Sequence, residues 1–312
     1  MSFLDKSDDF ESFLSLLNDT LEPVFGTAGP TGDSHTSVQI TGLPRTGTTI
    51  LYQLLARTGC VGYVSNLMAF FWRVPTVGAT LQRQLTTGEV TLSTSSMAGR
   101  TVEPLDPHEF GYFWRAVLGH SANSMVRDLE PWPIDRLQQV LDDVSKVFGA
   151  PTVYKNFLVL AHPDEMFTLP SARFLVLERP AIDVAASLVA LDRRVGGAAP
   201  ARLGLQPAPA EQVRDGSLVE QVARQVAVLE RARRRAGFER HPAALVVPYR
   251  KLCESPRETV GEVLEFIGGD LRQLDPGRLP ASLTPGAGAT DLAPAERRVL
   301  QRLLDEELEG AM

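Results

Sequence analysis

A glycine-bounded loop between a strand pattern and a helix pattern constrains the fold of this chain most. Residues 38–59 read VQITGLPRTGTTILYQLLARTG. The β-branched and apolar start predicts a strand over 38–41, and the leucines after the loop predict a helix that ends near Gly59. A strand that turns through glycines into a helix points several backbone N–H groups at one anion, and the helix dipole adds to their attraction. We therefore expect residues 42–49 to bind a phosphate-like group.

The rest of the chain alternates between strand and helix patterns. Apolar spacing predicts helices over 10–25, 134–148 and 255–268, and further strands over 152–154, 173–177 and 244–247. This alternation is typical of the α/β class, in which a central parallel sheet carries helices on both faces in three layers. The binding crevice of such a fold lies at the carboxyl ends of the strands. The candidate site residues should therefore converge there.

Two segments interrupt this pattern. Residues 76–100 are polar, small and weakly patterned, and we expect an irregular cap there rather than core. Residues 195–217 are rich in glycine, alanine and proline without periodicity, which predicts a mobile loop or lid. Neither segment has the character of a domain boundary, and so residues 1–312 are expected to form a single domain.

Composition and charge exclude several classes of function. The 312 residues are 44% hydrophobic, which is ample for a buried core, and the formal net charge of −7 argues against a nucleic-acid partner. Cys60 and Cys253 fit neither a disulfide framework nor a zinc site, and we expect both to be reduced core thiols. No apolar run approaches the roughly 18 residues of a membrane span. Because the N-terminus is acidic and does not suit a signal peptide, we expect a cytoplasmic protein.

The loop departs from the nucleotide-triphosphate pattern at one position. In G-x-x-x-x-G-K-[ST], a lysine after the second glycine reaches the β- and γ-phosphates. Thr48 occupies that position here, and the nearest cation is Arg45 inside the loop. The missing lysine argues against a triphosphate with Mg²⁺. Thr48 and Thr49 instead offer hydroxyls and backbone amides, with the fixed charge of Arg45 near the terminal group.

This loop resembles that of a known enzyme family. Residues 44–49, PRTGTT, match the pattern P-[KR]-[ST]-G-[ST]-[ST] of the sulfotransferases that use 3′-phosphoadenosine 5′-phosphosulfate. The resemblance implies a P-loop-like sulfotransferase fold. It also implies that the loop holds the 5′-phosphosulfate through Arg45, Thr46, Gly47, Thr48 and Thr49.

A second segment supports the resemblance. Residues 174–188, FLVLERPAIDVAASL, place Arg179 after a predicted strand and Ser187 eight residues later. Pro180 can open a helix, so Ser187 should lie about two turns along it, roughly 10 Å away. The family binds the 3′-phosphate with an arginine and a serine in this arrangement, which implies the same role for Arg179 and Ser187. Residues 247–268, VPYRKLCESPRETVGEVLEFIG, are similar to a late structural segment of the family.

We expect Arg45 to be the first cation that stabilises charge on the leaving phosphate, and the resemblance assigns a second catalytic cation but leaves the general base open. It places Lys155, at the end of a predicted strand, near the bridging oxygen of the donor. Better-known members carry a histidine two residues later, where this chain has Phe157, and another branch carries a glutamate where this chain has the segment YVSN at 63–66. The remaining concentration of acid and base groups is TVEPLDPHEFGYFW at residues 101–114.

Within that segment His108 is the preferred base, because a free imidazole titrates near pH 6.5 and an adjacent carboxylate can orient it. Glu109 or Glu103 could orient His108 or could be the base themselves. Sulfuryl transfer needs no metal, and no cluster here has metal-ligand spacing. The aromatic residues expected to line an acceptor pocket are Phe70, Phe71, Trp72, Tyr112, Phe113 and Trp114.

With these residues, the resemblance implies transfer of a sulfuryl group from 3′-phosphoadenosine 5′-phosphosulfate to a hydroxyl of a small-molecule acceptor, as in secondary metabolism. The product nucleotide would be 3′-phosphoadenosine 5′-phosphate. Two alternatives stay open: a P-loop kinase or nucleotide hydrolase with a degenerate loop, and a non-catalytic nucleotide-binding protein of the same fold. The family's adenine-stacking tryptophan is Ile50 here. The sequence leaves the acceptor open among phenols, alcohols and sugars, and it leaves the oligomeric state open as well.

Overall fold

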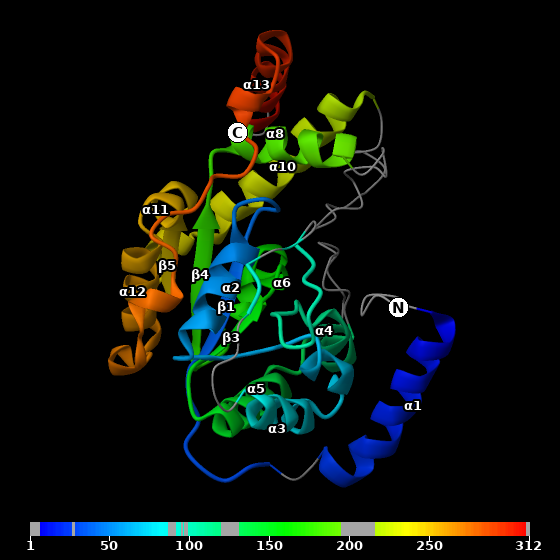
Figure 1. Ribbon diagram of the computed structural model, residues 1–312. Helices are drawn as coiled ribbons and strands as arrows, with labels where there is room; N and C mark the ends of the chain where they lie inside the picture. The colour runs from blue at the N-terminus through cyan, green and yellow to red at the C-terminus, as the bar shows by residue number, and fades with distance from the viewer. Residues whose placement is uncertain are drawn as a thin grey trace.

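A parallel sheet forms the centre of the molecule (Figure 1). The computed structural model describes residues 7–26, 29–86, 92–94, 96, 99–119, 131–194 and 216–309. Within these residues the sheet has five strands in the order β2-β3-β1-β4-β5, and each neighbouring pair is parallel. The strands are β1 (Ser37–Gly42), β2 (Gly62–Tyr63), β3 (Thr152–Lys155), β4 (Ala172–Glu178) and β5 (Ala244–Pro248). The predicted α/β class is therefore confirmed.

β1 is the central strand, and it positions the phosphate-binding loop. All six of its residues are buried. It pairs with β3 on one side, where Ile40 lies opposite Lys155, and with β4 on the other, where Gly42 lies opposite Leu177. Because parallel strands end at the same edge of a sheet, the segments that follow β1, β3 and β4 open onto one crevice.

Helices cover both faces of this sheet (Figure 1). The α-helices of the described residues are α1 (Asp8–Phe25), α2 (Thr48–Thr58), α3 (Pro75–Leu85), α4 (Gly111–Leu118), α5 (Ile134–Phe148), α6 (Leu158–Ala161), α7 (Pro163–Met166), α8 (Ala181–Arg194), α10 (Leu218–Ala236), α11 (Tyr249–Glu254), α12 (Pro256–Ile267) and α13 (Pro294–Glu309). Short 3₁₀ helices are η1 (Met68–Phe71), η3 (Phe238–Arg240), η4 (Leu271–Gln273), η5 (Pro276–Arg278) and η6 (Ala289–Asp291).

Two apolar clusters, one on each face of the sheet, hold the layers together. Successive side chains of a strand point to opposite faces. Phe174 and Val176 of β4 belong to the cluster that includes α5, α8 and α10, whereas Leu175 and Leu177 belong to the cluster that includes α2 and α12. The continuous apolar run of β4 is thus that of a strand covered on both sides, as parallel sheets require.

The predicted strands and helices lie where the sequence places them, with ends that differ by a few residues. The irregular cap predicted for 76–100 is wrong in its first part, because α3 occupies Pro75–Leu85 and packs on α5 and η1. A Cβ added at Gly78 would lie 2.9 Å from the Met68 carbonyl oxygen, so this glycine permits a close helix contact. Buried Gln82 then forms hydrogen bonds with the backbone of Tyr63 and Ser65.

The predicted loop at 195–217 lies outside the described residues except at its last two.

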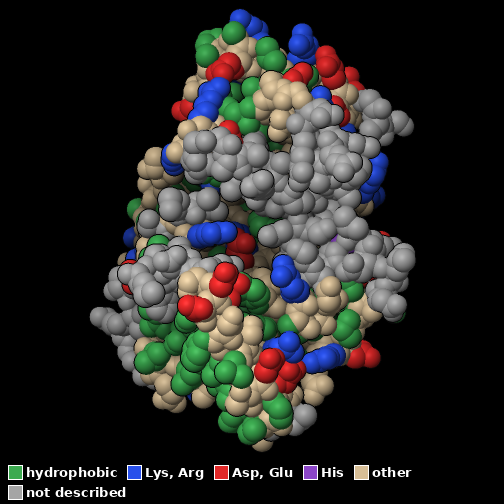
Figure 2. Space-filling model, turned by 90° about the vertical axis from the view of Figure 1, so that its right-hand side faces the viewer, with side chains coloured by type: hydrophobic (Ala, Val, Ile, Leu, Met, Phe, Trp, Pro, Cys, Tyr) green, Lys and Arg blue, Asp and Glu red, His purple; other side chains and the backbone are tan. Residues whose placement is uncertain are grey.

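α1 lies at the periphery, away from the sheet (Figure 1). Its anchor is the fully buried Asn18, whose amide donates to the Phe70 carbonyl oxygen at 2.7 Å and accepts from the Arg73 N–H at 2.9 Å. Figure 2 views the side of the molecule that carries α1, where hydrophobic side chains gather in the lower half. Exposed apolar residues of α1 include Phe13 and Leu16. The helix therefore packs through one stripe only.

Cys60 and Cys253 are buried free thiols, as the sequence predicts. Across the described ranges, no helix combines the length and apolar character needed to cross a bilayer. The same ranges contain no group of three or more His, Cys, Asp and Glu side chains that could hold a metal ion.

Candidate active site

The loop after β1 has the backbone geometry of an anion site. Gly42 has φ 146°, Arg45 has φ 70° and Gly47 has φ 96°, all in the region that favours glycine. Gly47 is the N-cap of α2 and offers no capping side chain, so the first N–H groups of the helix stay available to a ligand. A non-glycine residue with positive φ is strained, and such strain concentrates at ligand sites. Arg45 is that residue here.

Arg45 is held between the two residues predicted to bind the 3′-phosphate. Its Nε donates to Ser187 Oγ at 3.2 Å, and Arg179 Nη1 donates to the Arg45 carbonyl oxygen at 3.0 Å. The pKa of Arg45 is lowered because its guanidinium is buried and because Arg179 lies nearby. Two guanidinium groups brought together away from water favour an anion between them. The structure thus brings Arg45 together with two residues that are 134 and 142 positions away in the sequence.

Lys155 and Thr49 meet at the other end of the loop. Lys155 is the last residue of β3, its side chain is only 5% exposed, and its Nζ donates to Thr49 Oγ1 at 2.8 Å. The Glu109 carboxylate pairs with the same Nζ and is 41% exposed. Gly99 lies over this group, since a Cβ added there would lie 3.4 Å from both Lys155 Nζ and Thr49 Oγ1. A buried cation, a loop hydroxyl and a solvent-accessible carboxylate therefore form one cluster.

The other two candidate bases, His108 and Glu103, have different hydrogen-bond partners from Glu109. His108 Nδ1 accepts a hydrogen bond from the Phe110 backbone N–H at 2.9 Å, which leaves the proton of a neutral ring on Nε2. Glu103 is exposed, and its backbone forms a turn in which its N–H donates to Asp106 Oδ2 at 3.3 Å and its carbonyl oxygen accepts from Asn66 Nδ2 at 2.7 Å. Of the three candidates, Glu109 is the one in contact with Lys155.

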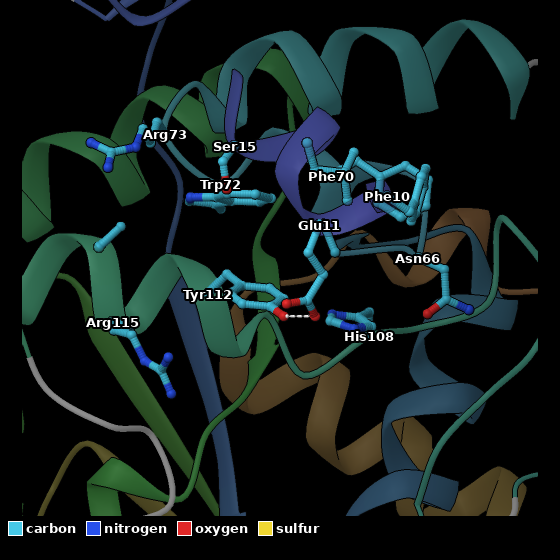
Figure 3. A pocket seen from close by; sticks show the side chains of 13 residues that line it. Phe10, Glu11, Ser15, Asn66, Phe70, Trp72, Arg73, His108, Tyr112 and Arg115 are labelled. Atoms are coloured by element: carbon cyan, nitrogen blue, oxygen red, sulfur yellow. Dashed lines mark hydrogen bonds between the residues drawn. The ribbon is translucent and has the colours of Figure 1, made fainter. Parts of the chain in front are cut away.

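A cavity of about 510 Å³ lies between α1, η1 and α4 (Figure 3). Its volume falls in the range of roughly 300 to 1,000 Å³ that is typical of small-molecule sites. His108 lines it together with Phe70, Trp72 and Tyr112 from the predicted aromatic set. Phe113 and Trp114, also in that set, are almost fully buried core residues instead. Phe71 is not among the lining residues.

The segments that build this site match one known sequence family. The model of the sulfotransferase family matches residues 37–273, from the start of β1 to η4. This chain belongs to the sulfotransferase family. No curated protein sequence matches this sulfotransferase significantly.

Solved sulfotransferase structures superpose on the chain. Sulfotransferase STF1 from Mycobacterium tuberculosis H37Rv does so with a TM-score of 0.53 and 15% identity, over 95% of this chain and 81% of that one. STF9 from Mycobacterium avium has a TM-score of 0.46 and 12% identity, over 95% and 72% of the two chains. The sulfotransferase domain from the curacin biosynthetic pathway has a TM-score of 0.42 and 11% identity, over 88% and 99%. The likeness to STF1 supports the P-loop-like sulfotransferase fold and carries no information on the acceptor.

The site of this sulfotransferase includes one group of residues that the sequence analysis missed. Arg179 Nη2 donates to the carbonyl oxygens of Gly286 at 3.0 Å and Ala287 at 2.6 Å, and its guanidinium lies 4.7 Å from the centre of the Tyr249 ring. Tyr249 also accepts from the Gly286 N–H at 2.8 Å. One signal for Tyr249 exists, because it directly follows β5 at the edge of the sheet where the site residues converge. Gly286 and Ala287 act through backbone atoms, which no residue pattern reveals.

Proposed function

We propose that this sulfotransferase transfers the sulfuryl group of 3′-phosphoadenosine 5′-phosphosulfate to a hydroxyl of a small-molecule acceptor. The observation that carries the proposal is the contact of Lys155 with Thr49 at one end of the loop, together with the convergence of Arg179 and Ser187 on Arg45 at the other. A donor with anionic groups at both ends needs cations at two separate places. Lys155 at one end of the loop, and Arg45 with Arg179 at the other, offer cations at two such places.

The residues present fit such a donor. The N–H groups of Thr48 and Thr49 begin α2 without a capping side chain, which suits the 5′-phosphosulfate. Arg179 and Ser187 suit the 3′-phosphate. Because Arg45 contacts both of them, we propose that its guanidinium serves this phosphate rather than the 5′-phosphosulfate that the resemblance implies for it. The donor supplies a sulfuryl group attached to a phosphate leaving group. To bind it, Arg179 would exchange hydrogen bonds to backbone carbonyl oxygens for stronger ones to a charged group.

The cluster around Lys155 suits the chemical step. Its Nζ can stabilise the negative charge that develops on the leaving phosphate oxygen, and its burial strengthens that interaction. We propose Glu109 as the general base, because its partly exposed carboxylate lies at Lys155 and can accept the proton of an acceptor hydroxyl. We propose that His108 orients the acceptor through Nε2–H, since its Nδ1 is already bound by Phe110.

Ligand binding tests the donor assignment without any acceptor. We would measure by calorimetry the binding of 3′-phosphoadenosine 5′-phosphate, of adenosine 5′-phosphate and of ATP with Mg²⁺, to the wild type and to Arg179→Ala. We expect clear preference for the 3′-phosphorylated nucleotide and loss of that preference in the variant. Equal binding of ATP with Mg²⁺, or no effect of Arg179→Ala, would contradict the proposal and favour a kinase or hydrolase.

A further inference from the structure

The cavity between α1, η1 and α4 has aromatic walls. Phe10 and Phe70 form one pair, with ring centroids 5.5 Å apart, and Trp72 and Tyr112 form another, 5.0 Å apart. Figure 3 shows the two pairs on opposite sides of Glu11. Walls of this kind favour a flat apolar molecule, because ring faces add specific stacking to apolar burial.

The chain connects one end of the cavity to the Lys155 cluster. His108 lines the cavity beside Glu11 (Figure 3), and the next residue, Glu109, pairs with Lys155. Asn66 gives a second link, since it also lines the cavity and donates to Thr101 Oγ1 at 3.1 Å, two residues after Gly99. A hydroxyl at the His108 end would therefore contact the residue that directly precedes Glu109 in the chain.

The charge in the cavity restricts its ligands. Tyr112 donates from its hydroxyl to Glu11 Oε1 at 2.6 Å, which directs this carboxylate between the aromatic walls. Arg73 also lines the cavity but pairs with Asp19 at 3.4 Å and Glu22 at 3.1 Å. Arg115 lines the cavity as well, and in Figure 3 its side chain extends away from Glu11 and Trp72. A carboxylate on the ligand would thus meet Glu11 at close range in a partly dry site, where like charges repel strongly.

We propose that this cavity is the acceptor site and that it takes an uncharged aromatic alcohol, a phenol or a fused-ring analogue, with its hydroxyl at His108. The inference rests on the proposed sulfuryl transfer, because it names the acceptor class for that site. It also gives α1 a function, since Phe10, Glu11 and Ser15 of this helix close one side of the cavity.

The first test fills the cavity from α1. Ser15 is an exposed lining residue, whereas Ser12 is exposed on the same helix and is not among the lining residues. We would measure binding of 2-naphthol by calorimetry without any donor, to the wild type, Ser15→Phe and Ser12→Phe. We expect Ser15→Phe to weaken binding by about tenfold or more and Ser12→Phe to leave it unchanged.

A second blocking variant comes from the opposite wall. Ala116 of α4 is exposed and lines the cavity, so Ala116→Phe should weaken 2-naphthol binding as Ser15→Phe does. Because the two substitutions lie on different helices, weaker binding in both would result from filling the cavity and not from a distortion of α1. Unchanged or tighter binding of 2-naphthol in both variants would overturn the assignment.

The third test concerns charge. We expect 6-hydroxy-2-naphthoate, which adds one carboxylate to 2-naphthol, to bind about tenfold more weakly to the wild type. Glu11→Gln keeps the acceptor atom for the Tyr112 hydroxyl and should remove most of this difference. Asp9→Asn, an exposed change on the same helix, should preserve it. The acceptor class would be refuted if the wild type bound 2-naphthol and 6-hydroxy-2-naphthoate equally, or if it bound D-glucose more strongly than 2-naphthol.

These experiments separate the inference from the proposed function. If 3′-phosphoadenosine 5′-phosphate binds as proposed but neither block affects 2-naphthol, the acceptor site is wrong and sulfuryl transfer stands. If the blocks act but the nucleotide does not bind, the cavity binds aromatic alcohols and the sulfuryl-transfer assignment fails, and with it the acceptor role of the cavity.

Discussion

Lys155 Nζ donates a hydrogen bond to Thr49 Oγ1 at 2.8 Å, which joins the end of β3 to the first turn of α2. The two residues are 106 positions apart in the chain. Their contact exists because β1 and β3 are parallel neighbours, so that the end of one strand lies beside the loop that follows the other. The cation that we propose for catalysis is thereby fixed by the sheet beside the loop after β1.

Replacing Lys155 by methionine should separate binding from catalysis. Methionine fills a similar volume but cannot stabilise charge on the leaving phosphate oxygen. We expect kcat for sulfuryl transfer to fall by about 100- to 1,000-fold, with affinity for 3′-phosphoadenosine 5′-phosphate within about threefold of the wild type. Lys251→Met, which removes only a surface pair with Glu262, is the control and should keep both values. A loss confined to nucleotide affinity would argue against the catalytic role.

The three candidate bases can be distinguished by substitution. Glu109→Gln keeps size and hydrogen bonding but cannot accept the proton, and we expect kcat to fall by about 100-fold or more. His108→Gln should raise KM for the acceptor more than it lowers kcat, because we assign His108 to orientation. Glu103→Gln should change little, since that side chain is exposed. Steady-state kinetics over a pH series would check this assignment. A general base makes kcat fall at acidic pH, and we expect this fall to disappear in Glu109→Gln. If it disappears in His108→Gln instead, the assignment is reversed.

The phosphate-binding loop could be predicted from sequence because its features are local. The glycines of residues 42–49, and the strand and helix on either side, lie within one short stretch. The convergence of Arg179 with the loop was also predictable, because parallel strands end at a common edge. In each case a general rule of the fold predicts which residues lie close together in space.

Other parts of the site depend on contacts that the sequence does not encode locally. Gly286 and Ala287 bind Arg179 through carbonyl oxygens, which every residue possesses. The orientation of His108 depends on Phe110, a non-glycine residue with φ 59°, whose N–H reaches back to Nδ1. Buried Gln82 makes the polar pattern of α3 misleading, because a hydrogen-bonded amide can lie in the core.

Gly47 should be intolerant of substitution on two separate grounds. Its φ of 96° strains any other residue, and an added Cβ would lie 2.5 Å from a ring carbon of Tyr249. We expect Gly47→Ala to lower the free energy of unfolding by about 2 kcal/mol or more and to weaken nucleotide binding. Gly261→Ala is the matched control, because Gly261 lies within α12 with nothing near its Cβ position. Urea unfolding should show stabilisation there of about 0.5–1 kcal/mol, and equal losses in both variants would contradict the account.

Asn18 should control α1 without affecting the nucleotide site. Asn18→Ala leaves the Phe70 carbonyl oxygen and the Arg73 N–H without this partner, which should destabilise the docking of α1 by roughly 2 kcal/mol. Because α1 is peripheral, we expect local opening: faster amide hydrogen exchange in α1 with protection of the β1 strand unchanged. Thr20→Ala, which removes only an exposed hydroxyl bonded within the same helix, is the control. Weaker 2-naphthol binding with unchanged binding of 3′-phosphoadenosine 5′-phosphate should accompany the opening, whereas parallel loss of both ligands would show that α1 supports the whole fold.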